Sequence, residues 1–446
     1  MKFLKILGSL LLILLSLTVI VWTGYFLWSA VPREKTPPKA LSTGHLFVAE
    51  EPEAKPPQES EAPAPETVEI PEEIPEEIPE EIPEEQPPME LPTPVPVEPD
   101  DGTGALAQEY LSTMTLEEKL WQLFIVTPEA LSGETIYASE STALALLQKP
   151  VGGMVYFGEN LQDREQTMTM LTNTQSYAWT PLFLAVDEEG GQVSRAGAKS
   201  SMGVTHFPAA AEYGAAGDEN GVYEAGSTLA QQLGELGFNL DFAPVADIIT
   251  NPNNKEIGNR AYSSDPQIAA DMVSAMVRGL EEGGMASCLK HFPGHGSTEA
   301  DSHEGLSVSS RTVEELRQNE WIPFASGVQA GASFVMVGHQ TNTNLSTFPA
   351  SLSPVVMAHL RAELGFDGVI ITDSLQMGAI VYHYTSAQAA VMAIQAGADM
   401  LLMPNDLQTA FDGLVAALDD GTLTEERIDE SVLRILKTKY RMGIME

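Results

Sequence analysis

The chain has 446 residues and carries 63 acidic residues against 23 lysines and arginines, a formal net charge of −40 at pH 7. Such acidity argues against a nucleic-acid partner, whose phosphates would be repelled. The single cysteine, Cys288, excludes an intrachain disulfide and leaves no cysteine near the N-terminus for lipid attachment.

Residues 1–35 are predicted to form a membrane anchor. An uncharged run, 6–31, follows Lys2 and Lys5, and about 20 apolar residues are enough for a helix to cross a bilayer. Aromatic residues gather toward the end of the run, as they do at a membrane interface. We expect a single-pass protein of the cell membrane with an extracellular catalytic domain. The alternative is a cleaved signal peptide that ends near Ala30 and a secreted protein.

Residues 36–103 are predicted to be a disordered linker. The motif Pro-Glu-Glu-Ile repeats from Pro71 onward, and the stretch from Arg33 to Thr103 carries a net charge of −16. Such a composition cannot bury a hydrophobic core. Proline and like-charge repulsion extend it at about 3.1 Å per residue, which gives a reach on the order of 200 Å. The linker would hold a domain away from the membrane; a plain solubilising tether is the alternative.

Residues 104–446 are predicted to form one catalytic domain of the α/β class. Helix-like segments such as Asp265–Glu282 and Thr312–Ala330 separate short apolar runs, an alternation typical of parallel βαβ units. Eight such units indicate a (β/α)8 TIM-type barrel, and a doubly wound sheet is the alternative. A capping-box pattern at Thr115 and Glu118 opens the first helix. The eight predicted strands are 123–126, 152–157, 181–186, 239–245, 286–291, 333–338, 368–373 and 399–403.

Polar residues follow nearly every predicted strand, where the active site of a barrel lies. Asp373 follows the apolar pair Ile370-Ile371, and its carboxylate could act as a nucleophile. The Asp187 carboxylate could accept hydrogen bonds from two hydroxyl groups of a ligand. The other polar residues at or soon after strand ends are Arg195, Asp247, Arg260, Lys290, His291, His339, Asn405 and Asp406.

The stretch from Lys290 to His303 holds three of the eight histidines. Proline and glycine after Phe292 force a loop, which carries Asp301 and His303. Alternate residues of an extended segment point the same way, so these two can face each other. A carboxylate beside an imidazole fixes its tautomer and tunes its basicity, as a general acid/base requires. A metal site is the weaker alternative, because Pro293 separates His291 from His295.

This stretch closely resembles the signature of glycoside hydrolase family 3, in its exo-β-N-acetylglucosaminidase branch. That branch carries Lys-His-Phe-Pro-Gly-His-Gly and then Asp-Ser-His at the same spacing. The resemblance extends from Leu116 to Met442. It includes Thr-Leu-Glu-Glu-Lys from Thr115, Gly-Gly-Met-Val-Tyr-Phe-Gly at 152–158, Val-Asp-Glu-Glu-Gly-Gly at 186–191, Asp-Phe-Ala-Pro-Val at 241–245 and Phe-Asp-Gly-Val-Ile at 366–370.

The resemblance implies a barrel-fold, retaining β-N-acetylhexosaminidase without a cofactor or metal. By it, Asp373 is the nucleophile, and His303 with Asp301 forms the acid/base dyad. His295 and Asp241 would be mainly structural. The partner is a glycan with a terminal N-acetylglucosamine, such as a peptidoglycan fragment, and a monomer is expected. The ligands of the sugar ring would be Asp187, Arg195, Arg260, Lys290 and His291.

Other functions stay open at this point. One is a metal-dependent hydrolase that uses His291, His295 and His303. Another is a non-catalytic glycan-binding wall protein on a barrel that has lost its activity. A variant of the β-N-acetylhexosaminidase hypothesis is an enzyme that transfers the sugar to phosphate instead of water. A histidine acid/base would not repel the phosphate anion as a carboxylate would.

Overall fold

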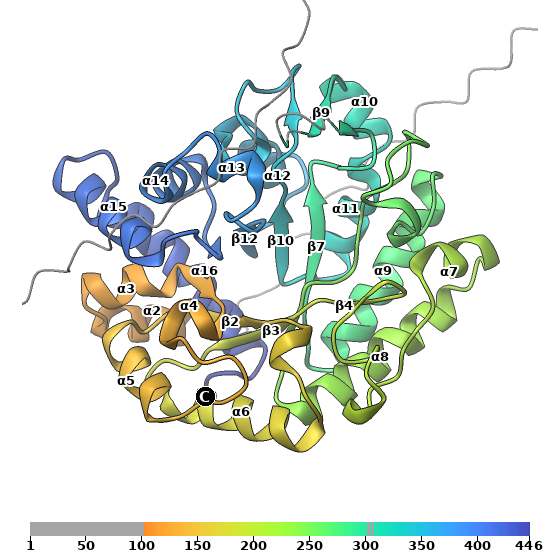
Figure 1. The fold of residues 1–446 in the computed structure, drawn as a ribbon. Coiled ribbons are helices and arrows are strands. Elements are labelled where there is room, and N and C mark those ends of the chain that lie inside the picture. Colours follow the sequence, from red (N-terminus) through yellow and green to blue (C-terminus); the bar gives the residue numbers. More distant parts are fainter. Residues whose placement is uncertain (1–101, 301–304, 306) are drawn as a thin grey trace, which may run out of the picture. The chain divides into compact units, whose positions relative to one another are not determined.

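A parallel β-barrel surrounded by helices forms the domain (Figure 1). The computed structural model describes residues 102–300, 305 and 307–446, so the predicted anchor and all but the last two residues of the predicted linker lie outside it. Among the helices of the described part, none has the length and apolarity to cross a bilayer.

Eight parallel strands form the barrel in the order β12-β10-β7-β6-β3-β2-β1-β13. A parallel bridge between Ile371 and Met400 joins the two edge strands, and the Thr372 amide donates to the Met400 carbonyl at 3.1 Å. This joined edge confirms the barrel and excludes the doubly wound sheet. The strands are β1 Phe124–Val126, β2 Gly153–Tyr156, β3 Phe183–Val186, β6 Leu240–Asp241, β7 Ala286–Phe292, β10 Phe334–Val337, β12 Val369–Thr372 and β13 Leu401–Leu402.

Two small sheets lie outside the barrel. One pairs β4 Glu188–Gly190 with β5 Val193–Ser194, and the other joins β8 Glu299–Ala300, β9 Ser307–Ser309 and β11 Thr341–Asn342. Each follows the carboxyl end of a barrel strand in the sequence. They therefore belong to the loops that build the catalytic end of such a fold.

The helices cover the outside of the barrel (Figure 1). Each of the long helices buries one apolar face, as for example α8, α9 and α16 do. The capping box predicted at Thr115 is present, because Thr115 Oγ1 accepts from the Glu118 amide and the Glu118 side chain accepts from the Thr115 amide. The helices are α2 Thr103–Thr113, α3 Leu116–Gln122, α4 Pro128–Ser132, α5 Glu140–Gln148, α6 Arg164–Tyr177, α7 Ala210–Ala216, α8 Glu219–Leu236, α9 Pro266–Glu282, α10 Val313–Gln318, α11 Trp321–Gln329, α12 Pro354–Ala362, α13 Gly378–Val381, α14 Ser386–Ala396, α15 Leu407–Asp419 and α16 Glu425–Arg441.

One predicted helix is divided in two. The segment 312–330 forms α10 and α11, with Asn319 and Glu320 between them. Pro323 explains the break, because it has no amide hydrogen and its ring clashes with the carbonyl four residues earlier, which is that of Asn319. Proline is tolerated in the first turn of a new helix, and there it stands in α11.

The end of the barrel opposite the predicted site is filled by a buried lysine. Lys439 of α16 donates from Nζ to Gln122 Oε1 at 2.8 Å, and Nζ lies 5.1 Å from the centre of the Phe183 ring. Burial lowers the pKa of this amine to about 7.

Candidate active site

The predicted site residues gather at the carboxyl end of the barrel. Asp187 directly follows β3, Lys290 and His291 lie near the end of β7, and Asp373 directly follows β12. Arg260 closes a short 3-10 turn after β6. The carboxyl ends of parallel barrel strands all meet at one end, so residues far apart in the sequence lie side by side.

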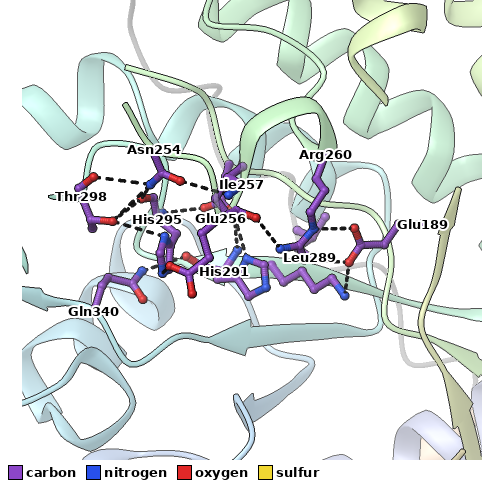
Figure 2. Close-up of polar contacts among 12 residues, drawn as sticks. Glu189, Asn254, Glu256, Ile257, Arg260, Leu289, His291, His295, Thr298 and Gln340 are labelled. Atoms are coloured by element: carbon purple, nitrogen blue, oxygen red, sulfur yellow. Dashed lines mark hydrogen bonds and ion pairs between the residues drawn. The ribbon is translucent and has the colours of Figure 1, made fainter. Parts of the chain in front are cut away.

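Five of these side chains form a line of alternating charge, which we call the charge row: Arg195, Asp187, Lys290, Glu189 and Arg260. Lys290 Nζ lies 2.8 Å from Asp187 Oδ1 and 2.6 Å from Glu189 Oε1. Both oxygens of the Glu189 carboxylate accept from Arg260, because Nε donates to Oε2 and Nη2 donates to Oε1, each at 2.8 Å (Figure 2). Arg195 Nη2 lies 3.5 Å from Asp187 Oδ2. Each anion of the row therefore stands between two cations.

The ionisation of the row follows from this pairing. Lys290 is only 2 % exposed, and burial by itself would lower its pKa; the adjacent carboxylates of Asp187 and Glu189 outweigh burial and raise it. Burial would raise the pKa of Glu189, but Lys290 and Arg260 lower it to about 2. Lys290 and Glu189 are therefore both charged at neutral pH, because neutralising either one would leave the buried opposite charge without this partner.

Arg195 is presented by the hairpin of β4 and β5. The buried carboxylate of Glu188 holds this hairpin by accepting from the backbone amides of Arg195 at 2.9 Å and Ala196 at 2.7 Å. The Arg195 guanidinium lies 5.5 Å from the centre of the Phe157 ring. Its Nε is buried and has no hydrogen-bond partner among the described residues. The side chain as a whole is 32 % exposed, so the exposed part of the guanidinium, rather than Nε, is what a ligand can reach.

A second buried carboxylate orients His291. Asp247 Oδ2 accepts from the His291 amide at 3.1 Å and lies 2.7 Å from His291 Nδ1, and Oδ1 accepts from the His295 amide at 2.6 Å. Burial opposes ionisation of Asp247, but its bonds to His291 outweigh burial and lower its pKa. An ionised carboxylate only accepts, so Nδ1 carries the hydrogen. Nε2 of His291 is then the nitrogen that can meet a ligand.

Replacing Asp247 with asparagine is expected to destabilise the fold by about 1–3 kcal/mol at pH 7. The carboxylate accepts from three N–H groups, and the NH2 group of asparagine would face at least one of them without forming a hydrogen bond. A carboxylate whose folded-state pKa is lowered contributes stability above its unfolded pKa of about 3.9, and this contribution is lost as the pH falls through the folded pKa. Thermal unfolding between pH 3 and pH 7 should therefore show a deficit that shrinks below about pH 4. Asp412→Asn on the exposed face of α15 serves as the control, and a deficit independent of pH would contradict the assignment.

Asp373 is placed beside two histidines. Its amide donates to the Val337 carbonyl at 2.9 Å, and its Oδ1 accepts from the Ser374 amide at 2.7 Å. Burial would raise its pKa, but the neighbouring His339 and His291, the hydrogen bond from the Ser374 amide and the Lys290 cation together outweigh burial and lower it. The carboxylate is thus ionised near neutral pH, which is the form that attacks as a nucleophile.

His339 holds the backbone that follows Asp373. Its Nε2 lies 2.8 Å from the Ser374 carbonyl, which only accepts, and its Nδ1 lies 2.7 Å from Ser351 Oγ. This pattern fits a neutral ring that donates from Nε2 and accepts at Nδ1, and burial lowers its pKa accordingly. His339 therefore fixes the start of the loop after β12.

Two predicted catalytic residues, Asp301 and His303, lie outside the described residues. In the sequence they stand between β8 and β9, whose backbones pair antiparallel.

The two residues predicted to have mainly structural roles, Asp241 and His295, are buried. Asp241 accepts from the Glu188 amide at 2.9 Å, and the His295 ring lies 3.5 Å from a Glu256 carboxylate oxygen (Figure 2).

Three contributors were given no role from the sequence: Glu189, Asp247 and His339. Glu189 is two residues beyond Asp187, so alternation along an extended segment could have indicated that both face the same way. Asp247 and His339 were recognised as strand-end residues, but their partners come from distant segments of the chain. Among the residues that the structure describes, no group of three or more histidine, cysteine, aspartate or glutamate side chains is arranged to hold a metal ion.

Comparison with known proteins agrees with the geometry. Residues 115–438 match the model of the glycosyl hydrolase family 3 N terminal domain. The beta-hexosaminidase of Stenotrophomonas maltophilia strain K279a is 36 % identical over 317 residues, which are 65 % of this chain and 92 % of that protein. Beta-hexosaminidase A of Pseudoalteromonas piscicida is 33 % identical over 324 residues, or 66 % of this chain. The chain spans only about half of that relative, 54 % of its length.

A solved structure of the same family is also similar to this chain. A glycoside hydrolase family 3 beta-N-acetylglucosaminidase from Paenibacillus sp. strain FPU-7 superposes with a TM-score of 0.70 at 37 % identity, covering 74 % of this chain and 63 % of that one. The resemblance found in the sequence is therefore confirmed over the whole barrel. The chain belongs to glycosyl hydrolase family 3, a family of glycosidases.

Proposed function

We propose that the protein is a retaining exo-β-N-acetylglucosaminidase that hydrolyses terminal N-acetyl-β-D-hexosaminides. One observation carries this proposal: an ionised Asp373 shares the carboxyl end of the barrel with the charge row and with His291. A nucleophilic carboxylate beside several fixed donors suits a sugar whose anomeric carbon must be held at the carboxylate. The names of the relatives, beta-hexosaminidase and beta-N-acetylglucosaminidase, support the choice of sugar.

The reaction would follow the two-step retaining route. Asp373 attacks the anomeric carbon and forms a glycosyl ester as the glycosidic bond breaks, and His303, oriented by Asp301, gives a proton to the leaving oxygen. Water then attacks the same carbon, His303 takes its proton, and the ester bond to Asp373 breaks. The sugar leaves with its original β configuration.

The charge row would bind the sugar. Lys290 Nζ has three hydrogens and two carboxylate partners, so one hydrogen remains for a hydroxyl group. The exposed part of the Arg195 guanidinium would offer further donors. Asp187 would accept from hydroxyls, and Arg260 and His291 Nε2 would complete the contacts around the ring.

The direct test compares paired aryl β-glycosides with and without the 2-acetamido group, using the full chain and His303→Ala. We expect the wild type to prefer the acetamido sugar strongly and the variant to lose the pH dependence that the imidazole provides. Equal rates on the two glycosides would contradict the substrate class. An unchanged pH profile in the variant would contradict the role of His303.

We further propose that residues 1–35 anchor the protein in the cell membrane and that residues 36–103 extend the catalytic domain outward, where peptidoglycan fragments would be the substrate. The support is the uncharged run 6–31 and the acidic, proline-rich composition that follows it. Fractionation of a bacterial host that expresses the full chain, or the chain without residues 1–35, tests this. Full-length protein in the soluble fraction would contradict the anchor.

A further inference from the structure

A pocket lies beside the loop that begins with Asp373. It has a volume of about 390 Å³, within the range of small-molecule sites. Leu375 lines the pocket, and two residues span at most about 7 Å of chain, so the pocket begins close to the nucleophile. The lining residues are Leu375, Val381, Tyr382, His383, Tyr384, Thr385, Ser386, Gln388 and Asn405.

Three chain segments that form the walls are joined by hydrogen bonds. The Leu375 amide donates to the Leu402 carbonyl at 2.9 Å, and the Asp406 amide donates to Ser386 Oγ at 3.0 Å. The Tyr384 amide donates to the Ile380 carbonyl at 2.9 Å. These bonds tie the loop after β12 to the start of α14 and to the loop after β13. The pocket is therefore built by fixed backbone (Figure 1 shows α13 and α14 beside β12).

Tyr382 supplies an aromatic face. Its side chain is 75 % exposed, although large aromatic side chains are usually buried for most of their area. One edge of the ring rests on Gly378, because a Cβ built there would lie 2.8 Å from Tyr382 Cε2. Gly378 thus lets the ring lie against the backbone of α13 while much of the ring faces solvent.

Groups that bind hydroxyls surround this ring. Thr385 Oγ1 and Gln388 Oε1 are engaged in the capping box of α14, and Ser386 Oγ accepts from the Asp406 amide. The Gln388 NH2 group, the Ser386 hydroxyl hydrogen and the Asn405 amide also line the pocket, and they can donate to or accept from hydroxyls. None of the pocket-lining side chains is a carboxylate or a lysine or arginine. An aromatic face with neutral donors and acceptors around it matches a pyranose ring, which has an apolar C–H face and a rim of hydroxyls.

We propose that this pocket is a subsite for the leaving-group side of the substrate, where it binds the neutral sugar ring next to the N-acetylglucosamine held at Asp373. The proposal rests on the proposed function, because it needs cleavage at Asp373. Tyr382 stacks on the second ring, and the polar rim accepts and donates hydrogen bonds to its hydroxyls.

The test compares two substrates that differ only in this second ring: N,N′-diacetylchitobiose and methyl N-acetyl-β-D-glucosaminide. In full-length protein, Tyr382→Ala is expected to lower kcat/KM for the disaccharide about 10-fold, as loss of one aromatic contact predicts. The methyl glycoside should change less than about two-fold, because it does not reach the pocket. Tyr382→Phe keeps the ring and should retain disaccharide cleavage.

Two further variants make the result specific. Gly378→Ala should displace the Tyr382 ring and lower disaccharide cleavage without changing the methyl glycoside. Tyr137→Ala is the matched control, because Tyr137 is 64 % exposed and lines a separate pocket against α6. An equal loss on both substrates, or no loss on either, would overturn the subsite while leaving the proposed function intact. A wild type that cleaves neither substrate would overturn the proposed function, and the subsite with it.

Discussion

Replacing Asp373 with alanine is expected to lower kcat on an aryl N-acetyl-β-glucosaminide by at least about 10³-fold, because the covalent route is lost with the attacking carboxylate. The chain should remain folded, since the amide of residue 373 still donates to the Val337 carbonyl. Thermal unfolding and steady-state rates measured on the same sample separate the two effects. Asp412→Ala, on the exposed face of α15, is the control for removing one negative charge.

Azide gives this experiment a second readout. A small anion can occupy the space of the missing carboxylate and attack the anomeric carbon from the same side. One displacement then occurs in place of two, so the product should be the α-glycosyl azide with inverted configuration. Rescue with retained configuration, or activity that survives the substitution without azide, would show that another group is the nucleophile.

Replacing Lys290 with methionine is expected to destabilise the fold by about 3–5 kcal/mol at pH 7, because it leaves two carboxylates at a buried position without their shared cation. The contacts of 2.8 Å to Asp187 and 2.6 Å to Glu189 would both be lost. Substrate binding would fall with them. Lys255→Met, at an exposed position before the turn that carries Arg260, is the matched control.

The pH dependence identifies the cause of this loss. In the wild type Glu189 has a pKa of about 2, so its stabilisation is present above the unfolded pKa of about 4.3 and is lost as the pH falls toward 2. Without Lys290 the carboxylates protonate at higher pH, which relieves their repulsion. Chemical unfolding at pH 7 and pH 4 should show the larger deficit at pH 7. A deficit of the same size at both would indicate lost packing instead of unpaired charge.

Much of the fold was predictable because the eight strands are continuous buried runs, and their predicted ranges overlap all eight observed strands. Turn chemistry also helped, because Thr115 and Glu118 form the predicted capping box. The segment predicted from Asp265 to Glu282 is α9, with Asp265 as its N-cap. The division of α10 from α11 was missed because the apolar pattern continues through Asn319 and Glu320. Pro323 was the local signal of that break.

The site was predictable where a strand end carries the reactive residue, as at Asp187, Lys290 and Asp373. The pairing of charges was not, because Glu189 reaches Lys290 and Arg260 from distant parts of the sequence. Likewise, Asp247 contacts a residue 44 positions away. The pocket with Tyr382 depends on backbone bonds between three segments, which no local pattern records.

The alternation of the charge row also restricts how the protein can diverge. Every interior member is bonded on both sides, so a change of sign at an interior position leaves two neighbours unbalanced. Substitutions there should be inherited in compensating pairs, such as a change at Glu189 accompanied by one at Lys290 or Arg260. Among family members with other sugar preferences, these positions are expected to vary together or not at all.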